Sequence, residues 1–170
     1  MKILAISGSA SRLSGNYYLL QAIADLWKDQ TEVEVIEGLE ELSLFSPKKL
    51  ETGPPNEIKL VKDKISTADL VLFATPEYSH NIPACLKSLL EWCTASGEFH
   101  QKKVIPITFT PHEPRGKYAM QSLLMSLQAL NARVLVQMTL YKTEVEIESH
   151  KIYLPEELKA LFLEALQMCK

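Results

Sequence analysis

Short apolar stretches alternate along the chain with longer segments in which apolar residues recur every three to four positions. The first kind predicts strands buried on both faces, and the second predicts amphipathic helices that pack on them. The predicted strands span residues 2–7, 33–37, 70–75, 104–109 and 133–138. The predicted helices span residues 14–28, with Ser14 as the N-cap, 57–66, 82–95 and 117–130, followed by a terminal helix that begins at Pro155.

Three places interrupt this regular pattern. Pro106 lies inside the fourth predicted strand, where it removes one ladder hydrogen bond. Residues 38–56 are polar and rich in proline, which predicts a long surface loop. Residues 140–154 mix alternation with acidic residues and predict a small extra strand or a hairpin.

Five strand–helix units predict an α/β fold with a parallel sheet covered by helices on both faces. The length of 170 residues suits a single domain over residues 1–170. Ligands of such folds bind outside the carboxyl ends of the strands, at the switch point of the strand order. In the order 2-1-3-4-5, the loops that converge there are residues 7–16, 75–83 and 110–117, called here the first, second and third loops.

Composition narrows the classes of partner. Hydrophobic residues make up 46% and charged residues 23% of the chain, and the formal net charge is -3. No basic face is implied, so we expect no nucleic acid partner. Three cysteines without CxxC spacing disfavour a disulfide framework and a metal site. The first apolar stretch is too short for a signal peptide and no apolar run is long enough to span a bilayer, so we expect a cytoplasmic protein without a membrane partner.

The first loop has the chemistry of a phosphate site. Gly8 lets the chain leave the strand tightly, and the helix that follows offers unpaired amides and a positive dipole end. The side chains that can add donors are Ser9, Ser11, Arg12, Ser14 and Asn16. Neither GxxxxGK nor GxGxxG is present, so neither a Walker A loop nor a dinucleotide fingerprint fits. A serine-rich turn that only caps the helix is the alternative.

The first loop, GSASRLSGN, and the segment TPEYSHNIPACLKSLLEW together resemble the NADPH-dependent FMN reductase family, which includes chromate, quinone and azo-dye reductases. The resemblance covers roughly residues 2–136 and implies a flavodoxin-like three-layer sandwich with FMN as cofactor and NADPH or NADH as co-substrate. It implies that the first loop binds the FMN phosphate and that backbone amides of the second loop bind the flavin ring. The expected cofactor-binding residues are Ser9, Ser11, Arg12, Ser14, Gly15, Asn16, Pro76, Glu77, Tyr78, Ser79, His80, Asn81, Thr110 and His112.

The chain departs from the family pattern in all three loops. Ser11 and Ser79 stand where the family usually has Arg and Asn, and Ala84 stands where it usually has Gly. The third loop retains a single glycine, Gly116, and contains two prolines. Its basic residues, His112, Arg115 and Lys117, have two interpretations: recognition of the NADPH phosphate, or a solvated surface loop.

The leading hypothesis for function is an NAD(P)H-dependent FMN oxidoreductase that passes hydride through bound FMN to a small acceptor such as a quinone or a metal oxyanion. No catalytic side chain is required, because the cofactor carries the chemistry. The alternatives are an FMN-binding electron carrier without NAD(P)H turnover, and a degenerate member that has lost flavin. The resemblance also implies a homodimer or a dimer of dimers, with the helices that begin near Ile82 and Lys117 as contact surfaces.

Overall fold

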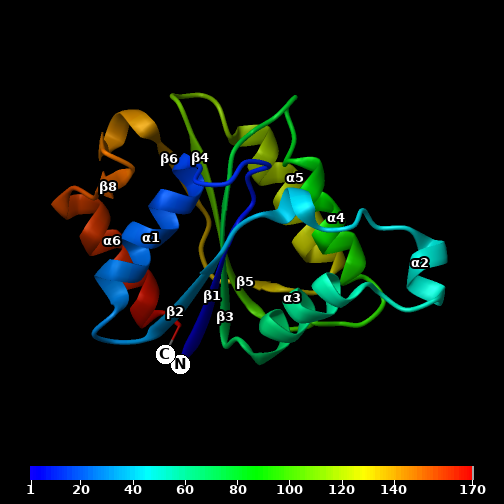
Figure 1. The fold of residues 1–170 in the computed structure, drawn as a ribbon. Helices are drawn as coiled ribbons and strands as arrows, with labels where there is room; N and C mark the ends of the chain where they lie inside the picture. The colour runs from blue at the N-terminus through cyan, green and yellow to red at the C-terminus, as the bar shows by residue number, and fades with distance from the viewer. Residues whose placement is uncertain (170) are drawn as a thin grey trace.

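The computed structural model describes residues 1–169, and a twisted parallel sheet forms its centre (Figure 1). Four strands lie in the order β2-β1-β3-β4, and two short strands both pair with β4 on its far side. The strands are β1 (Lys2–Ser7), β2 (Glu32–Ile36), β3 (Leu70–Thr75), β4 (Lys103–Thr110), β5 (Arg133–Val134) and β6 (Met138–Tyr141). The predicted order 2-1-3-4-5 is therefore confirmed.

Helices cover both faces of this sheet and produce the three predicted layers (Figure 1). On one face lie α1 (Gly15–Trp27) and α6 (Glu156–Gln167). On the other lie α3 (Asn56–Thr67), α4 (Ala84–Trp92) and α5 (Lys117–Ala129). Shorter elements are η1 (Leu39–Glu41), α2 (Pro47–Glu51), η2 (Lys142–Glu144) and a hairpin of β7 (Glu146–Glu148) and β8 (Lys151–Tyr153).

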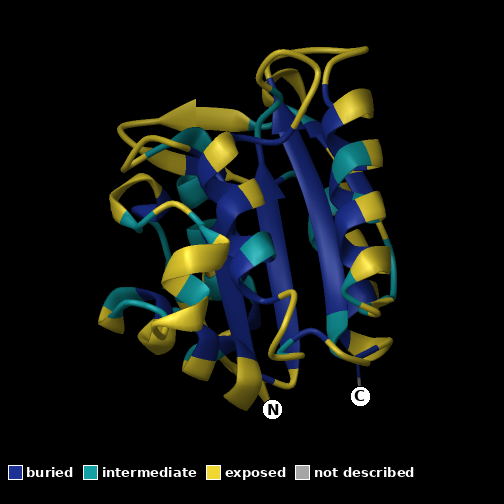
Figure 2. Ribbon diagram, turned by 90° about the vertical axis from the view of Figure 1, so that its right-hand side faces the viewer, coloured by how far each residue is buried: buried dark blue, intermediate teal, exposed yellow. Residues whose placement is uncertain are grey.

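The central strands are buried because each of their faces contributes to a separate apolar core. All six residues of β3 are buried, and successive side chains point to opposite faces. Leu72 therefore packs in the core under α1 and α6, whereas Phe73 packs in the core under α4 and α5. In Figure 2 the buried strands run between helices whose outer sides are exposed.

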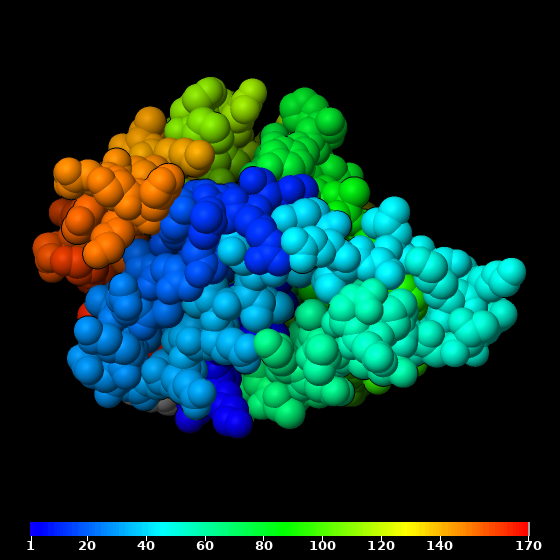
Figure 3. All heavy atoms as spheres, viewed as in Figure 1, coloured from blue at the N-terminus to red at the C-terminus, as the bar shows by residue number. Residues whose placement is uncertain are grey.

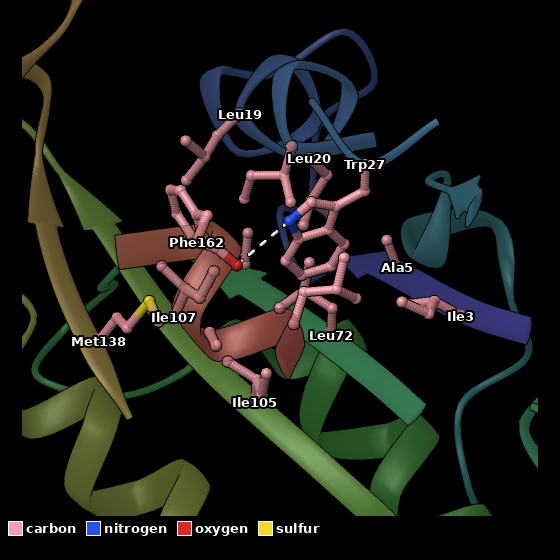
Figure 4. Packing of buried hydrophobic residues seen from close by; sticks show 14 of the residues in the cluster. Ile3, Ala5, Leu19, Leu20, Trp27, Leu72, Ile105, Ile107, Met138 and Phe162 are labelled. Carbon is pink, nitrogen blue, oxygen red and sulfur yellow. Dashed lines mark hydrogen bonds between the residues drawn. The ribbon is translucent and has the colours of Figure 1, made fainter. Parts of the chain in front are cut away.

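The core beneath α1 includes a polar link between the two helices that cover it. The indole Nε1 of Trp27, near the end of α1, donates a hydrogen bond of 3.2 Å to the backbone oxygen of Phe162 in α6 (Figure 4). Both side chains are fully buried, so the donor cannot bond to water instead. This contact fixes α6 on the sheet. The start of α6 after Pro155 confirms the predicted terminal helix.

The prediction of one continuous strand over residues 133–138 was wrong. Val134 pairs with Val104 and Met138 pairs with Ile107, so three residues of the edge chain face two residues of β4 between these points. The backbone oxygen of Val104 accepts a hydrogen bond from the amide of Leu135, so Val104 points its backbone groups toward the edge chain. Backbone groups alternate in direction along a strand, so the nitrogen of Pro106, two residues later, points toward the same edge chain. Proline has no N–H to donate, and the ladder breaks there.

The prediction of a long loop over residues 38–56 was wrong in part, because this segment contains η1 and α2. Between them the chain is fastened to α4: Trp92 Nε1 donates to the Ser43 oxygen at 2.8 Å, and the rings of Phe45 and Trp92 meet edge to face. The hairpin of β7 and β8 agrees with the expectation for residues 140–154. Among residues 1–169, none of the helices has the length and apolar character needed to cross a membrane.

Candidate functional site

The three loops meet at the carboxyl edge of the sheet, where β1, β3 and β4 end. In Figure 3 the first loop (blue) lies below the second loop (green) and the third loop (yellow-green) along the upper edge. The amide of Gly8 donates to the oxygen of Ala74 at 2.8 Å, which joins the start of the first loop to the end of β3. A Cβ atom at Gly8 would lie 2.7 Å from Leu86 Cδ2 and 3.1 Å from Thr75 Cβ, so any side chain here would displace buried neighbours.

The first loop ends in a capped helix, as predicted. Ser14 is the N-cap of α1, and its Oγ accepts a hydrogen bond from the amide of Tyr17 at 3.3 Å. Ser9, within the loop, is buried, and Asn16 in the first turn of α1 is only 4% exposed. The Asn16 Oδ1 atom is buried and has no hydrogen-bond partner among residues 1–169. An unpaired buried polar atom is costly, and this oxygen can only accept a hydrogen bond, so the donors that could meet a phosphate here are the amides of the helix N-terminus.

Arg12 faces away from this cap. Its guanidinium forms a two-point ion pair with Glu41, with nitrogen–oxygen distances of 2.7 and 3.0 Å. The hydrogen bond and charge of Arg12 lower the pKa of the Glu41 carboxyl. The neighbouring amide of Leu13 donates to Glu37 Oε2 at 2.7 Å, and Ser11 Oγ donates to the Arg12 oxygen. The acidic segment 37–41 thus binds Arg12, which the sequence assigned to phosphate, and the neighbouring amide of Leu13, so the role of Arg12 at the phosphate stays a prediction.

The second loop forms a tight two-residue turn. The amide of Tyr78 donates to the oxygen of Asn81 and the amide of Asn81 donates to the oxygen of Tyr78, both at 2.9 Å. Ser79 and His80 between them have φ angles of 49° and 58°, the left-handed region that a type I′ turn requires. Asn and Gly suit these positions best, so the turn carries strain in this chain.

Glu77 connects the second loop to the third. Its Oε2 atom accepts three backbone hydrogen bonds from the start of α5, given by Gly116 at 3.1 Å, Tyr118 at 3.0 Å and Ala119 at 3.1 Å. The Glu77 side chain is only 8% exposed. The residue before α5 is Gly116, which has no side chain to cap its own helix. A carboxylate from another loop satisfies these amides and complements the helix dipole.

Two other residues of the second loop also pack on α5. His80 Nδ1 lies 3.5 Å from Glu77 Oε1, and the His80 ring meets the ring of Tyr118 with centroids 4.6 Å apart. Asn81 Oδ1 accepts from the amide of Ile82 at 2.8 Å and from Ser122 Oγ at 2.5 Å. The side chains of Glu77, His80 and Asn81 therefore hold the loop in place.

The third loop is closed by its own hydrogen bonds. Thr110 Oγ1 donates to the oxygen of Arg115 at 3.1 Å, and His112 Nδ1 lies 2.9 Å from the oxygen of Glu113. Gly116 has a φ of 98°, and a Cβ atom there would lie 2.9 Å from Thr108 Oγ1. That hydroxyl is buried and unpartnered among residues 1–169. The three basic side chains of the loop are exposed, as both interpretations of them allow.

The structure also brings to the site a residue that sequence reasoning missed. Lys142, just after β6, places its Nζ 3.5 Å from the position that a Cβ on Gly15 would occupy. No local signal indicated this contact, because it depends on how β6 pairs with β4. No group of three or more His, Cys, Asp or Glu side chains within residues 1–169 is arranged to hold a metal ion.

The strand order and the loops at its carboxyl edge define a flavodoxin-like α/β protein with a site suited to a phosphate-bearing ligand. The model of the NADPH-dependent FMN reductase family matches residues 1–145, and the chain belongs to that family. Membership implies FMN as cofactor and NAD(P)H as co-substrate.

Named relatives agree with this assignment. The chain is 47% identical over 92 residues to the NADH-dependent flavin reductase subunit 2 of Lactobacillus johnsonii, covering 54% of this chain and 48% of the relative. It is 35% identical over 127 residues to the NADH:(hydroxy)cinnamate reductase subunit CrdA of Vibrio ruber, covering 75% and 62%. The matches thus span about half to three-fifths of these relatives.

A solved structure supports the fold itself. The flavoenzyme NAD(P)H:(acceptor) oxidoreductase FerB from Paracoccus denitrificans superposes with a TM-score of 0.75 at 18% identity, covering 99% of this chain and 94% of that one. An NADH:FMN oxidoreductase in its apo form gives 0.74 at 19% identity, covering 99% and 87%. At these identities the likeness concerns the fold alone.

Proposed function

We propose that this chain is an NAD(P)H-dependent FMN oxidoreductase that passes hydride to a small acceptor, a quinone or a metal oxyanion. The observation that carries the proposal is the start of α1 at the carboxyl edge of the sheet, where Ser14 caps a helix whose N-terminal amides can donate to a phosphate. The names of relatives support the acceptor class, since one of them is a quinone reductase of Pseudomonas putida.

The residues divide the work between two ends of the site. The α1 N-terminus, with Ser9, Ser14 and Asn16, would hold the phosphate. Backbone groups of residues 76–79 would lie along the ring edge, and Glu77 would keep them in register with α5 through its three amide contacts. FMN, when bound, supplies the hydride chemistry. The protein positions the cofactor, and the ion pair between Arg12 and Glu41 holds the outer side of the first loop in place.

A second candidate is an FMN-binding electron carrier. The third loop favours this candidate. It contains Pro111 and Pro114 and only one glycine, and the hydrogen bond from Thr110 to Arg115 closes it into a turn. A bulky third loop would restrict the space in which nicotinamide must stack. This candidate predicts bound flavin that a partner protein reduces and NAD(P)H does not.

The remaining parts of the proposal concern assembly and location. The chain acts as a single domain over residues 1–170 in the cytoplasm, and it pairs into a homodimer or a dimer of dimers through α4 and α5. Tyr118 and Met125, both exposed on α5, support this surface as the contact. An elution volume consistent with a monomer at high concentration would contradict the pairing.

The visible spectrum of the purified protein tests the function. FMN is added to saturation, excess flavin is removed, and NADPH or NADH is then added without oxygen. Loss of the oxidised-flavin absorbance, followed by its return on adding a quinone, is the expected result. Flavin that binds but stays oxidised with both nucleotides supports the carrier instead. Failure to bind FMN at micromolar concentration contradicts both and favours a member that has lost flavin.

A further inference from the structure

Lys142 lies against the first turn of α1 although it belongs to a distant part of the chain. Its Cε and Nζ atoms are 3.2 and 3.5 Å from the point where a Cβ on Gly15 would stand. In Figure 3 the orange segment that contains the hairpin β7–β8 borders the blue residues of α1. Glycine at this position leaves room for the lysine stem to cross the start of the helix.

The fold places Lys142 here by strand pairing. Tyr141, the last residue of β6, pairs with Thr110 at the carboxyl end of β4, so the chain leaves the sheet at the edge where the loops converge. η2 begins immediately and is held by the Tyr141 amide, which donates to Glu144 Oε2 at 2.7 Å. The backbone of Lys142 is therefore fixed even though its side chain is exposed.

The charges around the first loop leave this cation unpaired. Arg12 is bound by Glu41 through two contacts, whereas Lys142 makes no hydrogen bond or ion pair within residues 1–169. A phosphate group at a helix N-terminus carries close to two negative charges and gains from a nearby ammonium.

We propose that Lys142 binds the terminal phosphate of FMN, a phosphomonoester dianion, as the cation of the first loop in place of Arg12. This inference rests on the proposed function. Because the ammonium stays in contact with solvent, its contribution is that of a partly screened, charge-assisted contact, about five- to tenfold in the Kd of FMN at low salt.

Flavin titration of three variants tests this assignment. FMN and riboflavin, which lacks the phosphate, are titrated separately, and quenching of their fluorescence gives each Kd. Lys142→Gln is expected to raise the Kd of FMN about five- to tenfold and to leave that of riboflavin unchanged. Lys142→Arg, which keeps the charge, should stay within about twofold of the original chain. Lys151→Gln, an exposed lysine in β8, is the matched control and should change neither.

Salt provides an independent readout. Raising the ionic strength should weaken FMN binding by the original chain more than by Lys142→Gln, because the screened contact is missing in the variant. The role of Lys142 would be overturned if Lys142→Gln lost affinity for FMN and riboflavin equally, or if its Kd for FMN were unchanged. In either case, FMN binding by the original chain would leave the proposed function standing. If the original chain binds neither flavin, the proposed function and this inference both fail.

Discussion

Replacing Glu77 with alanine removes a buried carboxylate that joins two loops of the site. Three amides at the start of α5 would lose their acceptor at once, since all three donate to Oε2 within 3.0–3.1 Å. Gly116 before the helix offers no side chain as a replacement.

The cost follows from the hydrogen bonds and the helix dipole. A net hydrogen bond to a charged group contributes about 1.5–3 kcal/mol, but three bonds to one oxygen are not additive. A charge at a helix N-terminus adds about 0.3–1 kcal/mol. We therefore expect Glu77→Ala to lower the free energy of unfolding by about 2–4 kcal/mol. Glu77→Gln keeps an acceptor oxygen and loses the charge, so it should cost about 1–2 kcal/mol.

Urea denaturation followed by circular dichroism measures both variants. Glu146→Ala is the control, because this glutamate is exposed in β7, and its substitution should stay within about 0.5 kcal/mol of the original chain. FMN affinity should fall less in Glu77→Gln than in Glu77→Ala, since the loop that we propose to contact the ring loses its anchor. A Glu77→Ala protein as stable as the control would refute the claim that this carboxylate couples the second loop to α5.

Further predictions concern the close approaches, the turn and the thiols. Gly8→Ala should lower stability by about 1–3 kcal/mol in thermal unfolding, because its Cβ would lie 2.7 Å from Leu86 Cδ2; an unchanged Tm would contradict that clash. Ser79→Asn should raise stability by up to about 1 kcal/mol in urea, since this position has positive φ and the contact of His80 with Tyr118 is kept. Burial raises the pKa of all three cysteines, that of Cys93 to about 12, so their thiols are protonated at pH 8. A thiol reagent should then react slowly with the folded protein and with three thiols per chain in urea, and fast labelling of the folded state would argue against this burial.

The sequence was sufficient wherever structure depends on neighbours along the chain. The apolar run of β3 and the cap at Ser14 are local features, and both were predicted correctly. The break between β5 and β6 was missed because its cause lies on another strand, where Pro106 presents no N–H to the edge. A proline in one strand breaks the hydrogen-bond ladder of the adjacent strand, and the sequence of that adjacent strand does not indicate the break.

The same distinction explains the site. The three loops could be predicted, because the carboxyl ends of parallel strands meet at one edge. The directions of individual side chains could not, because each depends on a distant partner. Arg12 turns to Glu41, Glu77 turns to the start of α5, and Lys142 reaches α1 from β6. Residue type indicates the chemistry of each side chain, but the packing of the whole chain determines which partner that side chain contacts.

The two ends of the site are consequently held by different kinds of contact, and they should respond differently to mutation. At the proposed ring end, Glu77 is buried and bonded to three amides, so we expect folding and binding to depend on the same carboxylate. At the phosphate end, Lys142 is exposed and unpartnered among the described residues, so the fold does not depend on its charge. Substitutions at Glu77 should therefore change stability and affinity together, whereas Lys142→Gln should change affinity alone. Parallel losses of stability in both sets would show that the first loop also needs its cation in order to fold.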